Sequence, residues 1–132
     1  MQVRVSNISG TKIPYPSYLA RLAKNLSKSE KLGPINLVFC NDDYIRSLNQ
    51  KFLNLNKATD VLSFVYSEPE LLGEIYISAE TAKKQAPEWK NTFYQELRRL
   101  VVHGCLHLAG YNHSKAKSAK FMRLKEEFYL AQ

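Results

Sequence analysis

The sequence lacks the features that mark membrane, secreted and disulfide-rich proteins. No apolar run approaches the roughly 20 residues of a membrane-spanning helix, and the N-terminal MQVRVSNISG lacks the apolar core of a signal peptide. The two cysteines, Cys40 and Cys105, make no disulfide framework and fit a reducing compartment. No stretch resembles a linker, a repeat or a low-complexity segment. These absences predict one cytoplasmic globular domain over residues 1–132.

The sequence also has few acidic residues compared with basic ones. The 132 residues include 19 Lys and Arg against 12 Asp and Glu, which gives a net charge of +7 and a pI near 9.4. This balance favours a polyanionic partner, although many small basic domains carry similar charge without one. With 45% hydrophobic residues, the chain can bury one core but is too short for two.

Hydrophobic periodicity predicts an α+β fold with four strands and about five helices. Strands are expected over residues 2–8, 35–40, 59–66 and 72–78. Helices are expected over 17–31, 42–55 and 91–109, from Ser78 to near Pro87, and after Ser114. Asn41, Ser78 and Ser114 are expected to cap the helices that follow them. The predicted architecture is one sheet covered by helices.

The apolar stripes of the helices give an expected core. They comprise Tyr18, Leu19, Leu22 and Leu26; Ile45, Leu48, Phe52 and Leu55; Phe93, Leu97, Leu100, Val101 and Leu108; and Phe121, Leu124 and Phe128. The first and last helices also carry rows of cations. We expect these cations on the surface, either simply solvated or as part of an RNA footprint.

All three histidines lie in one short stretch, and their spacing predicts a metal site. His103 and His107 stand about 40° apart on a helix, so both rings can reach one ion. Gly110 can end that helix in a left-handed conformation, which lets His113 return to the same point. One such histidine is usually an ordinary core or surface residue, but three at this spacing favour Zn²⁺ with one position open to water. Cys105 points about 200° away from His103 and is expected to pack as a small apolar residue.

The histidine spacing is similar to the metzincin protease pattern H-E-x-x-H-x-x-G-x-x-H. Gly104 occupies the position of the glutamate that deprotonates the metal-bound water in those proteases. The comparison therefore supports metal binding, whereas peptide hydrolysis by that route lacks its general base.

Two sequence blocks resemble the YbeY family, bacterial rRNA-maturation factors described as zinc-dependent endoribonucleases. Residues 103–113, HGCLHLAGYNH, are similar to the family pattern H-G-x-L-H-L-x-G-Y-D-H. The other block runs from LN at 48–49 through TDVLSF at 59–64 to LGEIYIS at 72–78, and resembles L-N…T-D-V-L-S-F…L-G-D-I-x-I-S. Order, spacing and length agree from about residue 35 to the end of the chain.

The resemblance implies a single domain with a mixed four-stranded sheet and a zincin-like metal site. One Zn²⁺ would bind His103, His107 and His113. The implied substrate is small-subunit rRNA, and the implied partners are the ribosome or ribosome-associated proteins in the cytoplasm.

The resemblance also assigns roles to residues outside the histidine stretch. Thr59, Asp60 and Ser63 would lie on the cleft wall as catalytic candidates, although a carboxylate such as Asp60 can equally brace a turn. The arginine that commonly precedes the threonine by six residues is Leu53 here, and the usual aspartate before the last histidine is Asn112. Leucine cannot clamp a phosphate, and an amide adds no charge near the metal. RNA phosphates are therefore expected on four lysines: Lys51, Lys57, Lys115 and Lys117.

The resulting hypothesis is a metal-dependent endoribonuclease, specific for single-stranded RNA, in small-subunit rRNA maturation and ribosome quality control. Either a hydroxide formed on zinc attacks the phosphodiester, or the metal polarises the phosphoryl oxygen while the ribose 2′-hydroxyl attacks. The alternative is a ribosome-associated binding factor whose zinc mainly pins the last two helices. A metalloprotease is the third and weakest alternative.

Overall fold

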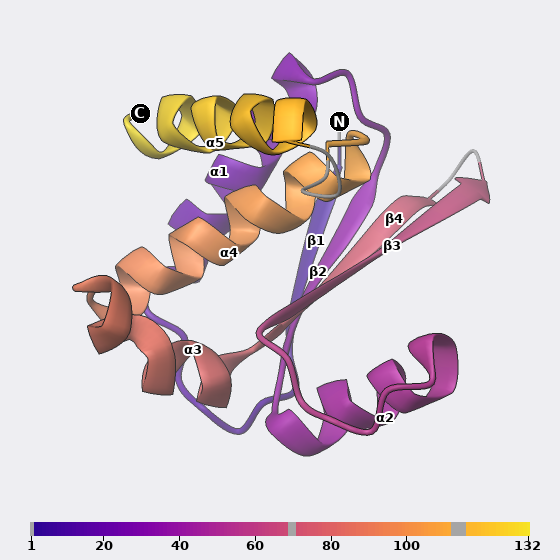
Figure 1. The fold of residues 1–132 in the computed structure, drawn as a ribbon, viewed down its shortest axis with the longest axis vertical. Helices are drawn as coiled ribbons and strands as arrows, with labels where there is room; N and C mark the ends of the chain where they lie inside the picture. Colours follow the sequence, from indigo (N-terminus) through magenta and orange to yellow (C-terminus); the bar gives the residue numbers. More distant parts are fainter. Residues whose placement is uncertain (1, 69–70, 112–115) are drawn as a thin grey trace.

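The computed structural model describes residues 2–68, 71–111 and 116–132 of the chain (Figure 1). The elements along the chain are β1 (Val3–Asn7), α1 (Pro16–Ser29), β2 (Ile35–Cys40), α2 (Asp42–Leu53), β3 (Val61–Glu68), β4 (Leu71–Ser78), α3 (Ala79–Gln85), the 3-10 helix η1 (Ala86–Trp89), α4 (Phe93–Leu108) and α5 (Ala116–Leu130). Within the described ranges, no helix is both long enough and apolar enough to cross a membrane.

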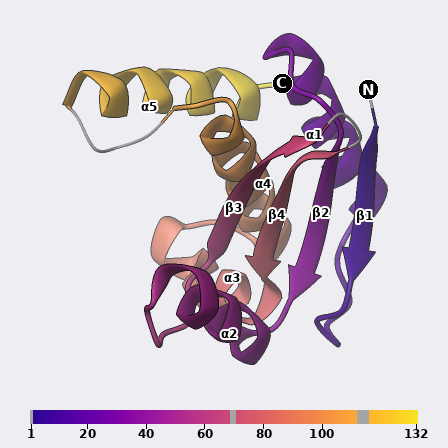
Figure 2. The ribbon, with the colours of Figure 1, turned by 90° about the vertical axis from the view of Figure 1, so that its right-hand side faces the viewer.

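The strands form one mixed sheet in the order β1-β2-β4-β3. β2 runs parallel to both of its neighbours and pairs Leu37 with Val5 on one side and with Ile75 on the other. β3 runs antiparallel to β4 at the sheet edge and pairs Ser63 with Ile75. Figure 1 shows α1, α4 and α5 on one side of the sheet and α2 on the other, and Figure 2 shows the strands face-on. The predicted α+β fold with a mixed four-stranded sheet is confirmed.

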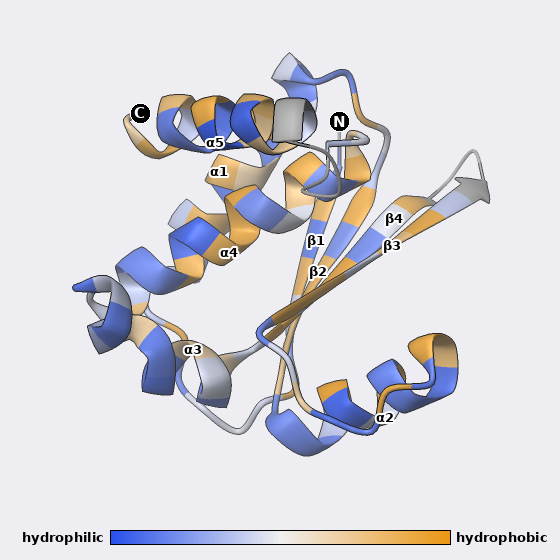
Figure 3. Ribbon diagram, viewed as in Figure 1, coloured by the Kyte–Doolittle hydropathy of each residue, from blue (hydrophilic) through white to orange (hydrophobic). Residues whose placement is uncertain are grey.

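The two central strands supply the middle of the core. Ile35, Leu37 and Phe39 of β2 and Ile75 and Ile77 of β4 are all buried. α1 and α4 cover them with their own buried side chains: Leu19, Ala23, Leu26, Leu97, Leu100, Val101, Cys105 and Leu106. Figure 3 shows apolar residues along the strands and hydrophilic residues over much of α2 and α3. The core therefore lies on the side of the sheet that α4 occupies.

Two of the three predicted N-caps are confirmed, and the third, Ser114, lies outside the described residues. The Asn41 side chain accepts a hydrogen bond from the Tyr44 backbone N–H at the start of α2, at 2.8 Å. The Ser78 hydroxyl accepts one from the Thr81 N–H at the start of α3, at 3.2 Å. Pro16 is the first residue of α1, where its missing N–H costs no helical hydrogen bond.

The predicted core of α2 is wrong in its second half. Ile45 is buried and Leu48 half-buried, but Phe52 and Leu55 are 55% and 46% exposed. Among the described elements, only α2 lies on its face of the sheet, so its last turn has no second layer to pack against. The Phe52 ring rests instead against Phe64 of β3, with the ring centroids 5.2 Å apart.

The predicted inner face of α5 is also wrong. All three residues expected inside are more than half exposed: Phe121, Leu124 and Phe128. Met122 and Tyr129 are buried instead, and the stripe between them contains the half-buried polar residues Lys125 and Glu126. A stripe interrupted by charge gives no apolar period that sequence reasoning could detect.

The prediction for Tyr18 of α1 is wrong as well. Its side chain is expected inside, but it is 52% exposed.

A buried carboxylate ties α4 to the helices before it. Glu96 is fully buried and accepts hydrogen bonds from Gln85 and Asn91, at 2.6 and 3.1 Å. Arg99 donates to both Glu96 oxygens, from Nε at 3.0 Å and Nη2 at 2.6 Å, and its guanidinium lies 4.2 Å from the Trp89 ring centroid. Burial raises the pKa of Glu96, but these donors outweigh it and hold the pKa below its ordinary value.

Replacing Glu96 with glutamine should lower the free energy of unfolding at neutral pH by about 2–4 kcal/mol, because Arg99 loses its charged partner. In the wild type, the contribution of Glu96 is fully present above the ordinary glutamate pKa of 4.5 and is lost as the pH falls through the lower folded-state pKa. Denaturant titrations from neutral to acidic pH should therefore show that the free energy of unfolding falls less steeply with acidification (a flatter acid limb) for Glu96→Gln than for the wild type. The exposed Glu88 offers a matched control, since Glu88→Gln should keep the wild-type limb. An acid limb in Glu96→Gln as steep as in the wild type would contradict this account.

Candidate metal centre

His103 and His107 lie side by side on the C-terminal half of α4. Their Nε2 atoms are 3.1 Å apart, and their ring centroids are 4.6 Å apart with the planes at 67°. Both residues are half-buried. The two rings thus present their Nε2 atoms to one point at the surface of the helix, as the i, i+4 spacing predicts.

The 3.1 Å separation of the two Nε2 atoms fits a hydrogen bond and also a shared ion. When one ring carries its proton on Nε2, it donates to the other. When neither does, both nitrogens are available as ligands. Zn–N bonds of about 2.0–2.1 Å in tetrahedral geometry place neighbouring ligand nitrogens about 3.3 Å apart. The pair therefore meets the geometric requirement for two imidazole ligands of Zn²⁺.

The other ring nitrogen of His103 faces a carboxylate. Its Nδ1 lies 3.7 Å from Oε2 of Glu126, on α5. A negative charge at this position favours the tautomer with the proton on Nδ1, which leaves the Nε2 lone pair for a ligand bond. Sequence reasoning missed Glu126 because it lies on a different helix and carries no local spacing signal.

The third predicted ligand, His113, lies outside the described residues. Within residues 2–68, 71–111 and 116–132, no three His, Cys, Asp or Glu side chains gather closely enough to hold a metal. Cys105 is fully buried and packs in the core as expected, and burial raises the pKa of its thiol to about 12. The three-histidine centre therefore stays a prediction that the His103 and His107 geometry supports.

Gly104 lets α4 approach the sheet closely between the two histidines. A Cβ at this position would lie 2.7 Å from Cγ2 of Ile75 and 3.3 Å from Oγ of Ser63. The Ser63 hydroxyl donates a hydrogen bond to the Gly104 carbonyl, at 3.1 Å. The missing side chain and this hydrogen bond together hold the histidine-bearing turn against β3 and β4.

A Schellman motif ends α4 directly after the histidines. The Gly110 N–H donates to the His107 carbonyl and the Tyr111 N–H donates to the Leu106 carbonyl, both at 3.0 Å. Gly110 has φ +98°, a conformation that glycine adopts without strain. The predicted left-handed cap at Gly110 is thus confirmed.

A cavity of about 280 Å³ opens beside the two imidazole rings. Of the described residues, it is lined by both histidines and by four residues of β3: Val61, Leu62, Ser63 and Val65. The cavity therefore combines two imidazole rings and one hydroxyl with an apolar wall.

The structure separates the three predicted catalytic candidates. Ser63 lines the cavity, whereas Thr59 and Asp60 lie just before β3 and are not among the described lining residues. The Asp60 carboxylate accepts hydrogen bonds from the next backbone N–H at 2.8 Å and from Gln85 at 3.0 Å, and it lies 3.9 Å from Arg99. The Thr59 hydroxyl donates to the same carboxylate at 3.4 Å. These contacts support the bracing role for Asp60, because they tie the start of β3 to α3 and α4.

Comparisons with known proteins agree with this geometry. The family model described as endoribonuclease YbeY matches residues 9–132. A curated endoribonuclease YbeY from Desulforamulus reducens is 40% identical over 96% of this chain and 94% of its own length.

The chain belongs to the YbeY family.

A second relative and a solved structure extend the match. The endoribonuclease YbeY of Pelotomaculum thermopropionicum is 37% identical over 100% of this chain and 97% of its own length. The solution structure of a Thermotoga maritima protein has 33% sequence identity and a TM-score of 0.67, and the match covers 98% of this chain and 87% of that one. The fold is thus similar to that of a solved structure, and the matches cover nearly all of this chain.

Two of the four predicted RNA-binding lysines flank the position where this chain departs from the YbeY pattern. Leu53 ends α2 and is exposed, and Lys51 and Lys57 are exposed beside it. The other two predicted lysines are not tested by the structure. Lys115 lies outside the described residues, and the side chain of Lys117 is not described. The region around the end of α2 therefore presents positive charge but no guanidinium at the family's arginine position.

Gly104→Ala should destabilise the protein by up to about 2 kcal/mol. The collision of the new methyl group with Ile75 should cost about 1–3 kcal/mol, and the higher helix propensity of alanine should recover roughly 1 kcal/mol. A double variant with Ile75→Ala should lose less stability than the sum of the two single changes, since truncation of Ile75 makes room. Denaturant unfolding of the four proteins measures this coupling. Strictly additive losses would show that α4 does not press on β4 at this point.

Proposed function

We propose that this chain is an endoribonuclease that cuts single-stranded RNA with one Zn²⁺ held by His103, His107 and His113. The observation that carries the proposal is the 3.1 Å approach of two Nε2 atoms at the wall of the cavity beside β3. Membership of the endoribonuclease YbeY family supports RNA as the substrate. The net charge of +7 suits a polyanion.

The residues of the cavity would hold the ion and orient the RNA. When bound, zinc supplies Lewis acidity, which either activates a water molecule or polarises a phosphoryl oxygen. His103 and His107 offer Nε2 as ligands, and Glu126 favours the tautomer that His103 needs. The Ser63 hydroxyl donates a hydrogen bond to the Gly104 carbonyl, so its oxygen remains able to accept a hydrogen bond from an RNA hydroxyl.

The proposed substrate is small-subunit rRNA, cut during maturation and ribosome quality control. The protein would act in the cytoplasm with the ribosome or ribosome-associated proteins. The support is the family membership together with the excess of cations. Lys51 and Lys57 would contact phosphates as mobile point charges, in place of the planar clamp that arginine would give at position 53.

A second candidate function is a ribosome-associated binding factor with a mainly structural zinc. The approach of Glu126 to His103 favours it, because an ion on α4 would also fix α5 through that carboxylate. A protease function gains no such support. A glutamate at position 104 would have to start from a Cβ only 2.7 Å from Ile75.

His107→Ala should reduce RNA cleavage at least about 100-fold and lower the zinc content, while the fold stays intact because the ring is only half-buried. Zinc per chain, thermal melting and cleavage of single-stranded RNA should be measured in parallel, with a chelator-treated wild type that should reproduce the loss.

The product ends distinguish the two routes of attack, since a 2′,3′-cyclic phosphate would assign the attack to the ribose hydroxyl. The outcome for His107→Ala distinguishes the candidate functions. Loss of the fold together with the zinc favours the structural candidate, and undiminished cleavage refutes the zinc mechanism.

Glu126→Gln should weaken zinc binding about tenfold, because it removes the charge that faces His103 Nδ1. Glu127→Gln is the matched control. Glu127 lies on the same helix and, like Glu126 and His103, lines a cavity between α4 and α5, and the variant should keep the wild-type affinity. Competition with a chromogenic chelator measures both affinities without any RNA. Equal affinities in the two variants would remove Glu126 from the environment of the ion.

A further inference from the structure

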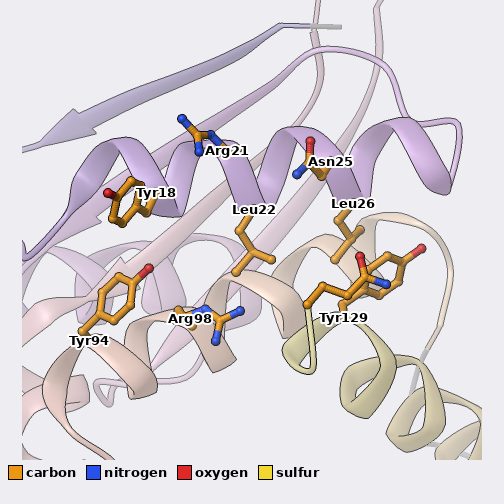
Figure 4. A pocket seen from close by; sticks show the side chains of 9 residues that line it. Tyr18, Arg21, Leu22, Asn25, Leu26, Tyr94, Arg98 and Tyr129 are labelled. Carbon is orange, nitrogen blue, oxygen red and sulfur yellow. The ribbon is translucent and has the colours of Figure 1, made fainter.

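A second cavity lies between α1 and α4 and is closed at one end by the last residues of α5. Its volume is about 280 Å³. Figure 4 shows Tyr18 and Leu22 descending from α1 toward Tyr94 and Arg98 of α4, with Tyr129 at the far end. None of the described residues that line it lines the cavity beside the histidines.

Aromatic rings line this cavity, and the exposed Tyr15 lies against two of them. Tyr18 is 52% exposed, and the exposed ring of Tyr15 stacks on it with centroids 5.6 Å apart and planes at 13°. Tyr94 meets Tyr15 edge-on at 5.3 Å. Aromatic rings held in place by their neighbours and open to solvent are suited to stack on nucleic acid bases.

Two guanidinium groups give the cavity its charge. Arg98 comes from α4, and Arg21 lies at the α1 rim with its guanidinium carbon 5.7 Å from the Tyr18 ring centroid. The described lining contains no Asp or Glu. The carboxylate behind Tyr129 is that of Glu30, which accepts hydrogen bonds from the Tyr129 hydroxyl at 2.5 Å and from a lysine at 3.3 Å. The two arginines are therefore the charged side chains among the described lining residues, and their planar forks match phosphate oxygens.

Helix geometry places this cavity on the opposite side of α4 from the histidines. Tyr94 and Arg98 are four residues apart and share one face. At about 100° per residue, Arg98 stands about 140° from His103 and 180° from His107. The same nucleotides cannot fill both cavities, so an RNA that uses both must pass around a helix about 10–12 Å across.

We propose that the cavity between α1 and α4 is a second binding site for single-stranded RNA, separate from the site of cleavage. A base stacks on Tyr18 while the adjoining phosphates pair with Arg21 and Arg98. The inference rests on the proposed function, because the RNA that it holds is the one cut beside His103 and His107. Long substrates then bind through both sites, and very short ones bind only at the histidines.

Cleavage kinetics with two RNA lengths test the proposal on the zinc-loaded protein. The long RNA has about 12 nucleotides, within the roughly 4–16 that single-strand-binding domains cover, and the short one has about four. Tyr18→Ala and Arg98→Gln should each raise the KM for the long RNA about tenfold without changing kcat, and should leave the short RNA unaffected. Lys28→Gln is the matched control, since it removes one positive charge from the exposed side of α1 outside the cavity. Its kinetics should equal those of the wild type.

Photocrosslinking of a thiouridine-labelled long RNA separates this inference from the proposed function. Crosslinks at the peptide that contains Tyr18, weakened by Arg98→Gln, support the second site even if no cleavage is detected. An unchanged KM for the long RNA in both variants, with normal wild-type cleavage, overturns the second site alone. Variants that keep full RNA affinity but lose an acidic ribosomal protein in a pull-down assign the cavity to a protein partner and also overturn the proposal.

Discussion

The close approach of α4 to the sheet constrains the rest of the structure. Gly104 on the helix has no room for a Cβ against Ile75. At Gly73 on β4, a Cβ would lie 2.6 Å from the Phe64 carbonyl oxygen of β3 and 2.7 Å from Cδ2 of Leu108. Gly104 therefore sets the depth of the helix, and Gly73 leaves room for both β3 and the Leu108 side chain. The Ser63 hydrogen bond to the Gly104 carbonyl fixes the rotation of the helix as well. Once the depth and the rotation of α4 against the sheet are set, the helical period determines where its side chains point. His103 and His107 then lie toward β3, at the edge of the sheet.

The two ends of α4 are fixed as firmly as its middle. At the start, Thr92 and Gln95 form a capping box, with side chain to backbone hydrogen bonds of 3.1 and 2.8 Å. The next residue, Glu96, is buried among donors from three segments. At the end, the Gly110 turn satisfies two carbonyls that a helix terminus otherwise leaves open. A metal site needs ligands held to within about 0.5 Å, and a helix restrained at both ends and along one side meets that need better than a loop.

The sequence predicts the local part of this arrangement and misses the part that depends on packing. The i, i+4 histidines, the Gly110 cap and the Asn41 and Ser78 caps are each set by residues within one helical turn, so their signals survive without the fold. The exposure of Phe52, by contrast, is not set by neighbouring residues in the sequence. Its helical period shows which side of α2 is apolar, but not that α2 has a face of the sheet to itself. In α5 the true inner stripe includes Glu126, and only the position of α4 gives a carboxylate a reason to lie there.

Two of the positions that break the hydrophobic pattern, Glu126 and Tyr18, lie at the candidate sites. A carboxylate half-buried between two helices is unfavourable unless positive charge or a proton donor faces it. His103 provides that partner to Glu126, since its Nδ1 can carry a proton while its Nε2 faces the cavity. Tyr18 shows the reverse exception, an aromatic ring left in solvent although its helix buries neighbouring leucines. Where a residue departs from the expected hydrophobic pattern while its surroundings stay well packed, we expect a surface adapted to bind a ligand rather than to form the core. On that physical ground, the two proposed sites lie on the two sides of α4 rather than on its buried face.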